Sequence, residues 1–527
     1  MQKGGGHSAA RSHAFASIVV VCAAMVGAVA ISLWTQPAHA LPSFARQTGQ
    51  PCATCHTDYP ALTPYGRRFK LYGYTIGGGK YRTTPFPSSP KDKAEIAFEY
   101  AKTAALPFPA LDSGKEKSDL VAYADTIHPI AGYVAEETGP KGWVPPISIM
   151  GVLGLTHTDS PQAPPTAPYK PNDNVTLDPV SFFWGGAITQ HVGAFAQVTY
   201  AGPPPGGFSD PFGKTWTWDN TDIRYANATS IGGMDVVYGL TFNNNPTVQD
   251  LWNTTPAWGF PYASSTIAPG PSASTIIEGA FAAHVVSAGA YAMINDILYL
   301  EVTGYRTLDF HTLNSLGEDP FDMPGPLKGV APYWRIALEP HWGNHYFMLG
   351  AFGMLSKVNP WVNMPLVADP TATFPQTDNF TDVGFDTQYQ YQGLGWWLTL
   401  RGTLIREYQQ LNASFANMLS ANPTNQLNSL KLQGSLAFGD NNRIVLTAQH
   451  FRIWGTQDLL LFPSGSPDSD GWTAELAYIP FGMSKAPGWP WANVRLALQY
   501  TWYHRVDGIT FGAQNDNTIF LHAWFAM

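Results

Sequence analysis

The sequence predicts a mainly β protein: a transmembrane β-barrel of about 16 strands, preceded by a short α-helical segment. Three observations lead to this fold class. Charged residues make up only 13% of the chain, against roughly 25% in ordinary soluble domains. Aromatic residues are frequent, yet after residue 40 no run of about 18 apolar residues offers a membrane helix. From about residue 121, apolar and polar residues alternate, as in strands between lipid and a polar lumen.

A secretory signal peptide is predicted over residues 1–40. Lys3 and Arg11 supply its positive end, residues 14–34 form its apolar run, and residues 38–40 match a small-x-small cleavage site. The apolar run is long for a signal peptide, so an uncleaved membrane anchor remains an alternative. Export would place the rest of the chain outside the cytoplasm, where conditions are oxidising.

The next segment, residues 41–82, carries the motif Cys-x-x-Cys-His at residues 52–56. This motif is the attachment signature of c-type haem. Two thiols at this spacing can each add to one vinyl group of a single haem, and the adjacent imidazole then becomes the proximal ligand of the iron. We therefore predict one covalent haem c, attached at Cys52 and Cys55 and ligated by His56, so that residues 41–82 form a monohaem cytochrome c segment.

Two other kinds of site use paired cysteines. A thioredoxin-like redox pair needs no histidine after the second cysteine and lies in a βαβ pattern. A structural zinc site needs a second pair of ligands, but the third cysteine, Cys22, lies in the predicted signal peptide. Both alternatives therefore fit these residues less well than haem attachment.

A linker and then the barrel are expected to follow. Residues 83–120 are rich in Pro, Lys and Ser and are predicted to be a linker, and residues 121–527 to be a porin-like outer-membrane barrel. Alternation is clearest over residues 192–200, 333–339 and 492–502. An even number of strands suits a bacterial barrel. The candidate strands begin near residues 147, 180, 192, 221, 234, 275, 290, 333, 344, 380, 395, 428, 442, 471, 492 and 517.

The gaps between these candidate strands alternate in length. Short gaps, such as 188–191, are typical of periplasmic turns, and long gaps rich in Pro and Asn, such as 202–220 and 243–274, are typical of outer loops. The chain ends at Met527 with Phe525 two residues before it, a weakened form of the aromatic ending usual in outer-membrane barrels. A soluble, β-rich periplasmic protein is the alternative to a barrel.

The chain resembles a known family, the fused cytochrome–porins of the outer membrane. The resemblance lies in residues 44–49, the haem motif at 52–56 and the run Gly-Arg-Arg-Phe-Lys at 66–70. Residues 243–250 and 252–261 also resemble that family's pattern. Its best-known members are iron oxidases of iron-oxidising bacteria. The resemblance implies electron transfer at the outer membrane, with Fe(II) or another extracellular donor and a periplasmic c-type cytochrome as partners.

The haem segment does not supply a second axial ligand of the usual kind, since residues 57–127 contain neither His nor Met. The segment is also too short to bury a haem unaided. We therefore expect it to dock on or inside the barrel, which would complete the pocket. An open sixth position is an alternative. His128 is the first distal-ligand candidate in the sequence, and the other donors are Met150, His157, His191, Lys70, Lys80 and the amine of Leu41.

Basic residues follow the motif in the same segment. Arg67, Arg68 and Lys70 are expected to pair with haem propionates or with acidic residues of the barrel. The Trp and Tyr residues of the barrel are expected to form girdles at the membrane interfaces rather than electron relays.

Two polar clusters allow both a functional and a structural interpretation. Asp219, Asp222 and Arg224 offer carboxylates of the kind that hard cations such as Fe(II) prefer, but such a cluster more often braces a barrel wall. His341 and His345 have a spacing that binds metal on a helix; they are not in a helical context, so a plain turn is favoured.

Charge limits the partners that the chain can have. Removing Lys3 and Arg11 with the signal peptide takes the formal net charge from −9 to about −11. This excess of acid argues against nucleic acid as a partner, and it suits a lumen that attracts cations or ordinary acidic loops. The partners expected are outer-membrane lipid, an extracellular electron donor and a periplasmic cytochrome. The haem segment is expected in the periplasm or in the lumen.

Three functions remain open from the sequence. The first is oxidation of extracellular Fe(II) at a single haem, with electrons passed to periplasmic cytochromes. The second is a transport porin whose haem segment acts as a plug. The third is electron exchange at the cell surface with another donor or acceptor.

Overall fold

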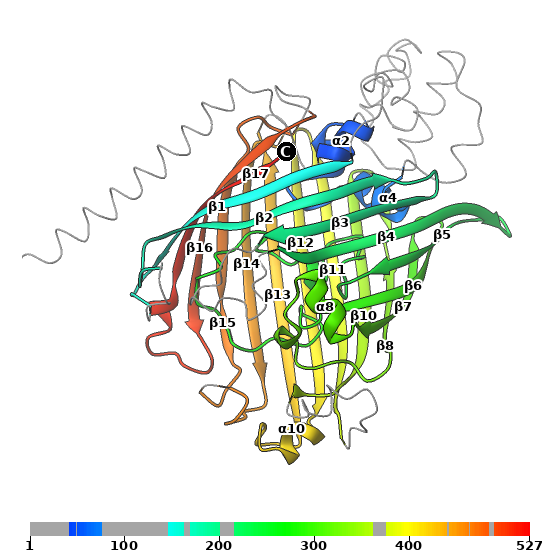
Figure 1. Cartoon of the computed structure of the whole chain (residues 1–527). Helices are drawn as coiled ribbons and strands as arrows, with labels where there is room; N and C mark the ends of the chain where they lie inside the picture. Colours follow the sequence, from blue (N-terminus) through cyan, green and yellow to red (C-terminus); the bar gives the residue numbers. More distant parts are fainter. Residues whose placement is uncertain are drawn as a thin grey trace, which may run out of the picture.

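The structure is a computed structural model, drawn in Figure 1. The predicted signal peptide at 1–40, the linker at 83–120, His128 and Lys80 lie outside the described residues. The structure describes residues 42–48, 50–75, 146–162, 169–200, 216–361, 376–439, 442–462, 464–483 and 490–527.

Antiparallel strands form a closed barrel. Each long strand pairs with the next long strand along the chain, and β1 pairs with both β2 and β17, which closes the ring. The two-residue β9 pairs with β10, as β8 does, and continues β8. Sixteen long strands therefore form the wall, and the predicted fold class is confirmed. The strands are β1 (Ile147–Thr158), β2 (Asn174–Ala187), β3 (Val192–Tyr200), β4 (Trp216–Ile231), β5 (Met234–Asn243), β6 (Val285–Ile294), β7 (Leu298–Thr307), β8 (Ala331–Leu338), β9 (His341–Trp342), β10 (His345–Val358), β11 (Asp378–Gly393), β12 (Trp396–Gln410), β13 (Thr424–Phe438), β14 (Ile444–Gly455), β15 (Ser469–Tyr478), β16 (Asn493–Arg505) and β17 (Thr518–Ala526).

The helices are short. No helix in the described part of the chain has the length and apolar character needed to cross a membrane. The helices are α2 (Pro42–Thr48), α3 (Cys52–Cys55), α4 (Pro64–Leu71), α8 (Phe310–Leu316) and α10 (Asn412–Ala416), with short 3₁₀ helices η1 (Pro256–Trp258), η2 (Pro320–Asp322) and η4 (Ala513–Asp516).

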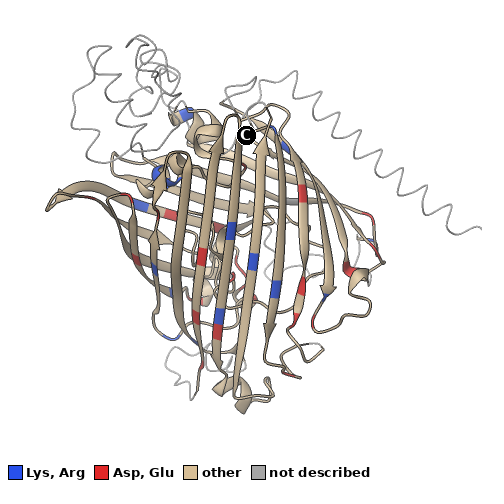
Figure 2. Ribbon diagram, turned by 180° about the vertical axis from the view of Figure 1, so that it is seen from behind, with Lys and Arg blue, Asp and Glu red and all other residues tan. Residues whose placement is uncertain are grey.

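The outer face of the wall is apolar and the inner face is polar. On β8, Trp334, Ile336 and Leu338 are exposed outward, whereas Arg335 and Ala337 between them are buried on the lumen side. This alternation is typical of a barrel that crosses a membrane. Figure 2 shows charged residues along the strands, and the strand-interior ones that are buried include Arg224, Glu301, Arg335, Asp382, Asp386, Arg401, Glu407, Glu475 and Arg495.

Two of the predicted strand starts are wrong. Strands were expected near residues 275 and 290, but β6 begins at Val285 and β7 at Leu298. Residues 276–284 instead form consecutive turns. Their apolar side chains, such as Ile277 and Phe281, are buried in a cluster with Tyr305 and Phe352 of the wall. An apolar run looks the same in sequence whether it faces lipid or another part of the protein.

The two ends of the barrel differ. Short turns such as 232–233, 295–297 and 394–395 lie at one end, together with the start of β1 and the end of β17. Helices α2 and α4 lie at this same end in Figure 1, and α10, in a long loop, lies at the other. The long loops are therefore at the end opposite the helical segment.

The longest described loop, residues 244–284, folds into the lumen. Its Asp250 carboxylate pairs with Arg335 of β8 at 3.2 Å, and the carbonyl of Phe260 accepts a hydrogen bond from Gln449 of β14 at 2.9 Å. The loop thus contacts strands that lie far apart around the wall. We call residues 244–284 the inner loop; its first part was predicted to be an outer loop.

Candidate functional site

The haem motif forms a single helical turn and the residue after it. Cys52 and Cys55 are the first and last residues of α3, so their side chains lie one turn apart on one face. Both are free thiols. His56 leaves the helix in an extended conformation and forms a β-bridge with Leu62. The spacing in the sequence therefore places both thiols and the imidazole on one compact element.

Helix α4 packs tightly against this element. The Thr63 side chain caps α4 by accepting a hydrogen bond from the amide of Gly66 at 3.2 Å, and the Thr63 amide donates to the carbonyl of Cys55 at 2.9 Å. A Cβ on Gly66 would lie 2.2 Å from the carbonyl oxygen of Cys55, so glycine is required for this approach. The second half of the segment thus fixes the position of the motif.

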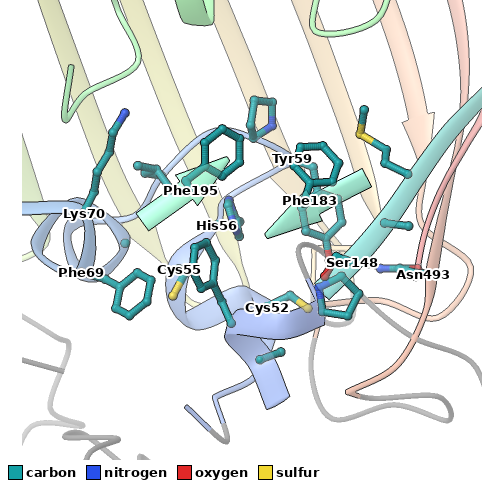
Figure 3. Close-up of a pocket in the computed structure, with 18 of the residues that line it drawn as sticks. Cys52, Cys55, His56, Tyr59, Phe69, Lys70, Ser148, Phe183, Phe195 and Asn493 are labelled. Carbon is teal, nitrogen blue, oxygen red and sulfur yellow. Dashed lines mark hydrogen bonds between the residues drawn. The ribbon is translucent and has the colours of Figure 1, made fainter. Parts of the chain in front are cut away.

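The motif borders a cavity of about 350 Å³, within the range of small-molecule and cofactor sites. Figure 3 shows Cys52, Cys55 and His56 together with Phe183 and Phe195, which come from β2 and β3 of the wall. The inner loop adds further lining residues, including Trp258 and Tyr262, and β16 adds Asn493 and Arg495. The cavity is therefore enclosed jointly by the segment, the wall and the inner loop.

The electrostatic surroundings keep the motif neutral. Burial raises the pKa of Cys52 and of Cys55 to about 12, whereas a redox-active dithiol needs a thiolate with a lowered pKa. Burial lowers the pKa of His56 to about 4, against the opposing effect of the Pro60 and Ala61 backbone. The imidazole is thus neutral, as a metal ligand must be, and its Nδ1 is buried without a hydrogen-bond partner among the described residues.

These properties are those that an attached haem requires. Two thiols and a neutral imidazole face one cavity, and aromatic side chains make up much of its lining. A zinc site lacks ligands, since the described residues contain no group of three or more His, Cys, Asp or Glu side chains placed to hold a metal ion.

Buried ion pairs fasten the segment to β16. Arg495 donates two hydrogen bonds to Asp58, at 3.0 and 2.9 Å, and a third to Glu475 of β15 at 2.6 Å. All three side chains are almost fully buried. Beside them, Asn493 donates to the Tyr59 hydroxyl at 3.1 Å. These contacts could not be predicted from the sequence, because more than 400 residues separate the partners.

The three basic residues after the motif have distinct partners. Arg67 pairs with Glu339 and Arg68 with Asp296, so the expected pairing with acidic barrel residues is confirmed for both. Lys70 instead lines the cavity. Its ammonium group donates to the carbonyls of Val248 and Asp250 at 2.7 and 2.6 Å.

Lys70 also lies against an aromatic ring of the inner loop. Its Nζ is 4.6 Å from the centre of the Trp258 ring. Burial, together with nearby Arg224, lowers the pKa of Lys70 to about 7. Of the three basic residues, only Lys70 lines the cavity. Lys70 is therefore the one placed to meet an anionic group of a ligand there.

The predicted acidic cluster on β4 is a structural network. Asp222 pairs with Arg224 at 2.7 Å, and both are fully buried. The Tyr74 hydroxyl of the segment donates to the same Asp222 carboxylate at 2.7 Å. Asp219 bonds separately to Thr199. These contacts fit the interpretation of the cluster as a network that braces the barrel wall. Through Tyr74 the network also holds the C-terminal end of the described part of the segment.

The two distal-ligand histidines that the structure describes, His157 and His191, do not line the cavity. His157 pairs with Asp173 at 2.7 Å and is 39% exposed, and the Nδ1 of His191 contacts the carbonyl of Ala226. His345 is hydrogen-bonded to Tyr389, and with His341 it belongs to no metal-holding group among the described residues. Of the distal candidates that the structure describes, Met150 and Lys70 line the cavity; His128, Lys80 and Leu41 lie outside the described residues.

Sequence reasoning missed much of the wall of the cavity. Phe183, Phe195, Asn493 and Arg495 lie in ordinary alternating strands and carry no local signal. The inner loop did carry one, since residues 252–261 stood out in the sequence, but its inward path did not follow from that pattern.

Comparisons with known proteins give a low level of similarity. No protein-family model matches the chain, and no curated protein matches it. Among solved structures, OmpF of Salmonella typhi in complex with daunomycin has 13% identity and a TM-score of 0.40, covering 72% of this chain and 97% of its own. The outer-membrane channel DcaP of Acinetobacter baumannii has 9% identity and a TM-score of 0.38, with 72% and 96% covered.

A loop-deletion mutant of the outer-membrane protein OmpT of Vibrio cholerae is similar to the same degree. It has 9% identity and a TM-score of 0.36, with 72% of this chain and 98% of that chain covered. Similarity at this level carries no argument about function. The closed barrel is established by its own strand pairing.

Proposed function

We propose that this protein is an electron-transfer protein of the bacterial outer membrane. In this proposal, a single haem c is attached at Cys52 and Cys55 and ligated by His56. It oxidises extracellular Fe(II), and the electrons pass to a periplasmic c-type cytochrome. The observation that carries the proposal is the cavity beside the motif, which the segment, the wall and the inner loop enclose together.

The protein groups around the cavity have distinct roles in this proposal. The two thiols would hold a haem covalently, His56 would ligate its iron, and Lys70 would be the cation available to an anionic substituent of the haem. The aromatic lining, which includes Phe183 and Phe195, excludes water and so helps to set the potential. Bound haem supplies a one-electron centre: Fe(II) becomes Fe(III), and the electron then reduces an oxidised cytochrome c.

The two ends of the barrel support the direction of transfer. Short turns face the periplasm in bacterial barrels and long loops face outward. The haem segment lies at the short-turn end (Figure 1), where a periplasmic acceptor has the shortest path. The apolar outer face supports insertion in the outer membrane.

The reduction of the protein by Fe(II) tests the proposal. Purified full-length protein is oxidised, mixed anaerobically with Fe(II), and followed by absorption in a stopped-flow instrument. We expect the haem bands to change to those of the reduced form within seconds, and a His56→Ala variant to lose the response. Another outcome is covalent haem that stays oxidised with Fe(II) but is reduced by dithionite. This outcome would exclude iron as the donor. It would still be consistent with electron transfer and would favour exchange with another partner at the cell surface.

A transport porin is the second candidate, and the closed barrel favours it. The inner loop lies in the lumen and the segment packs against the wall at the short-turn end, so the proposed electron-transfer function goes with a small conductance in planar bilayers. A large conductance that is the same in wild-type and in haem-free Cys52→Ala/Cys55→Ala protein would favour transport over electron transfer.

A further inference from the structure

We infer that the thioether of Met150 is the second axial ligand of the haem iron. This inference rests on the proposed function, because it requires a haem in the cavity that His56 borders. Met150 was one of several candidates in the sequence, and the structure brings it to the same cavity as His56.

Met150 lies on the lumen face of β1, close to the short-turn end of the barrel. Two residues before it on the same face, the Ser148 hydroxyl accepts a hydrogen bond from the Ser43 amide of the segment at 3.0 Å. Because strand side chains alternate, Met150 points toward the segment as well. It packs against the aromatic cluster of Tyr74, Phe183 and Phe195 that lines the cavity.

The other potential iron ligands around the cavity are engaged elsewhere. Apart from the motif itself, lining side chains with atoms that bind haem iron are one methionine, one lysine and three tyrosines. Lys70 donates a hydrogen bond to the Val248 carbonyl and Tyr74 donates one to Asp222, whereas Tyr59 and Tyr262 accept hydrogen bonds from Asn493 and Arg401. To ligate iron, each tyrosine would have to lose its phenolic proton, and Lys70 would have to lose a proton of its ammonium group.

A thioether does not have this conflict. Its sulfur accepts only weak hydrogen bonds, so a buried methionine can turn toward a metal at little cost. Its flexible, unbranched side chain also adapts to an irregular pocket. Methionine opposite histidine raises the potential of haem iron, which favours acceptance of electrons from Fe(II). The ligand pair thus fits the proposed direction of transfer.

A second buried methionine provides a matched control. Met483 packs with Cys52 and Tyr59 in one cluster, and its carbonyl accepts a hydrogen bond from the Ala53 amide at 2.7 Å. It is fully buried but does not line the cavity. It therefore shares the chemistry and the neighbourhood of Met150 without facing the haem position.

The experiment compares full-length wild-type, Met150→Leu, Met150→His and Met483→Leu proteins, each with covalent haem quantified after denaturation. We expect ferric wild type to show the long-wavelength charge-transfer band of thioether ligation. Met150→Leu should lose this band, bind carbon monoxide when reduced and have a lower potential. Met150→His should give a low-spin bis-histidine spectrum, and Met483→Leu should match wild type.

Three outcomes separate the possible failures. Absence of covalent haem from the wild type would overturn the proposed function itself. Haem with a wild-type spectrum in Met150→Leu would overturn only the assignment of Met150. A bis-histidine spectrum in the wild type would also overturn it and would direct attention to His128.

Discussion

At the scale of single residues, Arg495 connects the haem segment to the barrel. Its guanidinium lies between Asp58 of the segment and Glu475 of β15, and all three groups are buried. Such a pair contributes little over an apolar replacement, but the loss of one partner leaves uncompensated charge inside the protein. The arginine therefore matters most through the two carboxylates that it neutralises.

We expect Arg495→Met to destabilise the protein by roughly 3–5 kcal/mol, because Asp58 and Glu475 would remain buried without the cation that neutralises them. The unfolding midpoint in guanidinium, measured on protein folded into vesicles, checks this. Asp58→Asn should cost less, since Arg495 keeps Glu475. Lys328→Met, at an exposed loop position, is the control and should stay within about 0.5 kcal/mol of wild type. Equal effects at positions 328 and 495 would contradict this account.

The identity of the motif could be predicted at this scale, and the partners of the motif could not. Cys52, Cys55 and His56 are neighbours in sequence, so their common chemistry is visible locally. Arg495 and Asn493 have ordinary positions in an alternating strand, and nothing near them in sequence marks them as contacts of the segment. Met150 was visible as a donor, but only the folded chain brings it to the cavity.

At the scale of elements, α3 and α4 depend on each other. Helices of four and eight residues are too short to be stable alone. They are held together by the Thr63 cap and by the close approach of Gly66 to the carbonyl of Cys55. The motif therefore keeps its shape only while α4 remains against it.

Gly66→Ala tests this dependence. The added Cβ would lie 2.2 Å from a backbone oxygen that cannot move independently, so α4 must shift, at a cost of about 1–3 kcal/mol. We expect a lower yield of covalent haem per molecule of folded protein, read from haem absorbance against protein absorbance. Gly434→Ala is the control, because its Cβ would meet only the Leu400 side chain at an ordinary 3.5 Å. A normal haem yield in Gly66→Ala would show that α4 does not position the motif.

The strands could be predicted better than the loops. Sixteen strands were expected and sixteen long strands form the wall, because lipid on one side and a polar lumen on the other impose a period of two. The inner loop broke this rule. Its residues 275–284 bury apolar side chains against the inside of the wall, and no local pattern distinguishes that environment from lipid.

At the scale of the whole molecule, the barrel does two things. Its outer face presents apolar side chains such as Leu404, while its inner face contacts the inner loop and, at the short-turn end, the segment that carries the motif. The wall is thus both the membrane anchor and most of the enclosure that the short segment lacks. We regard the barrel as part of the haem site rather than as a carrier for it.

Leu404→Arg tests the membrane orientation of the wall. Leu404 is 39% exposed near the middle of β12, and an arginine there would cost roughly 2–4 kcal/mol if the position faces the bilayer centre. The free energy of folding into lipid vesicles measures this cost. Leu394→Arg is the control, because Leu394 is fully exposed in a short turn and should tolerate the charge. A tolerated arginine at position 404 would contradict the placement of this face in lipid.

The Cys-x-x-Cys-His motif, the alternation of the barrel strands and the lack of His or Met at residues 57–127 can all be recognised in the sequence, because spacing, composition and period are local properties. What encloses the cavity cannot be read in this way: the inward path of residues 244–284, the aromatic side chains from β2 and β3, and the place of Met150 on β1 are seen only in the folded chain. A closed barrel brings residues from distant strands to one lumen, and which of them meet depends on register and closure rather than on any neighbouring residue.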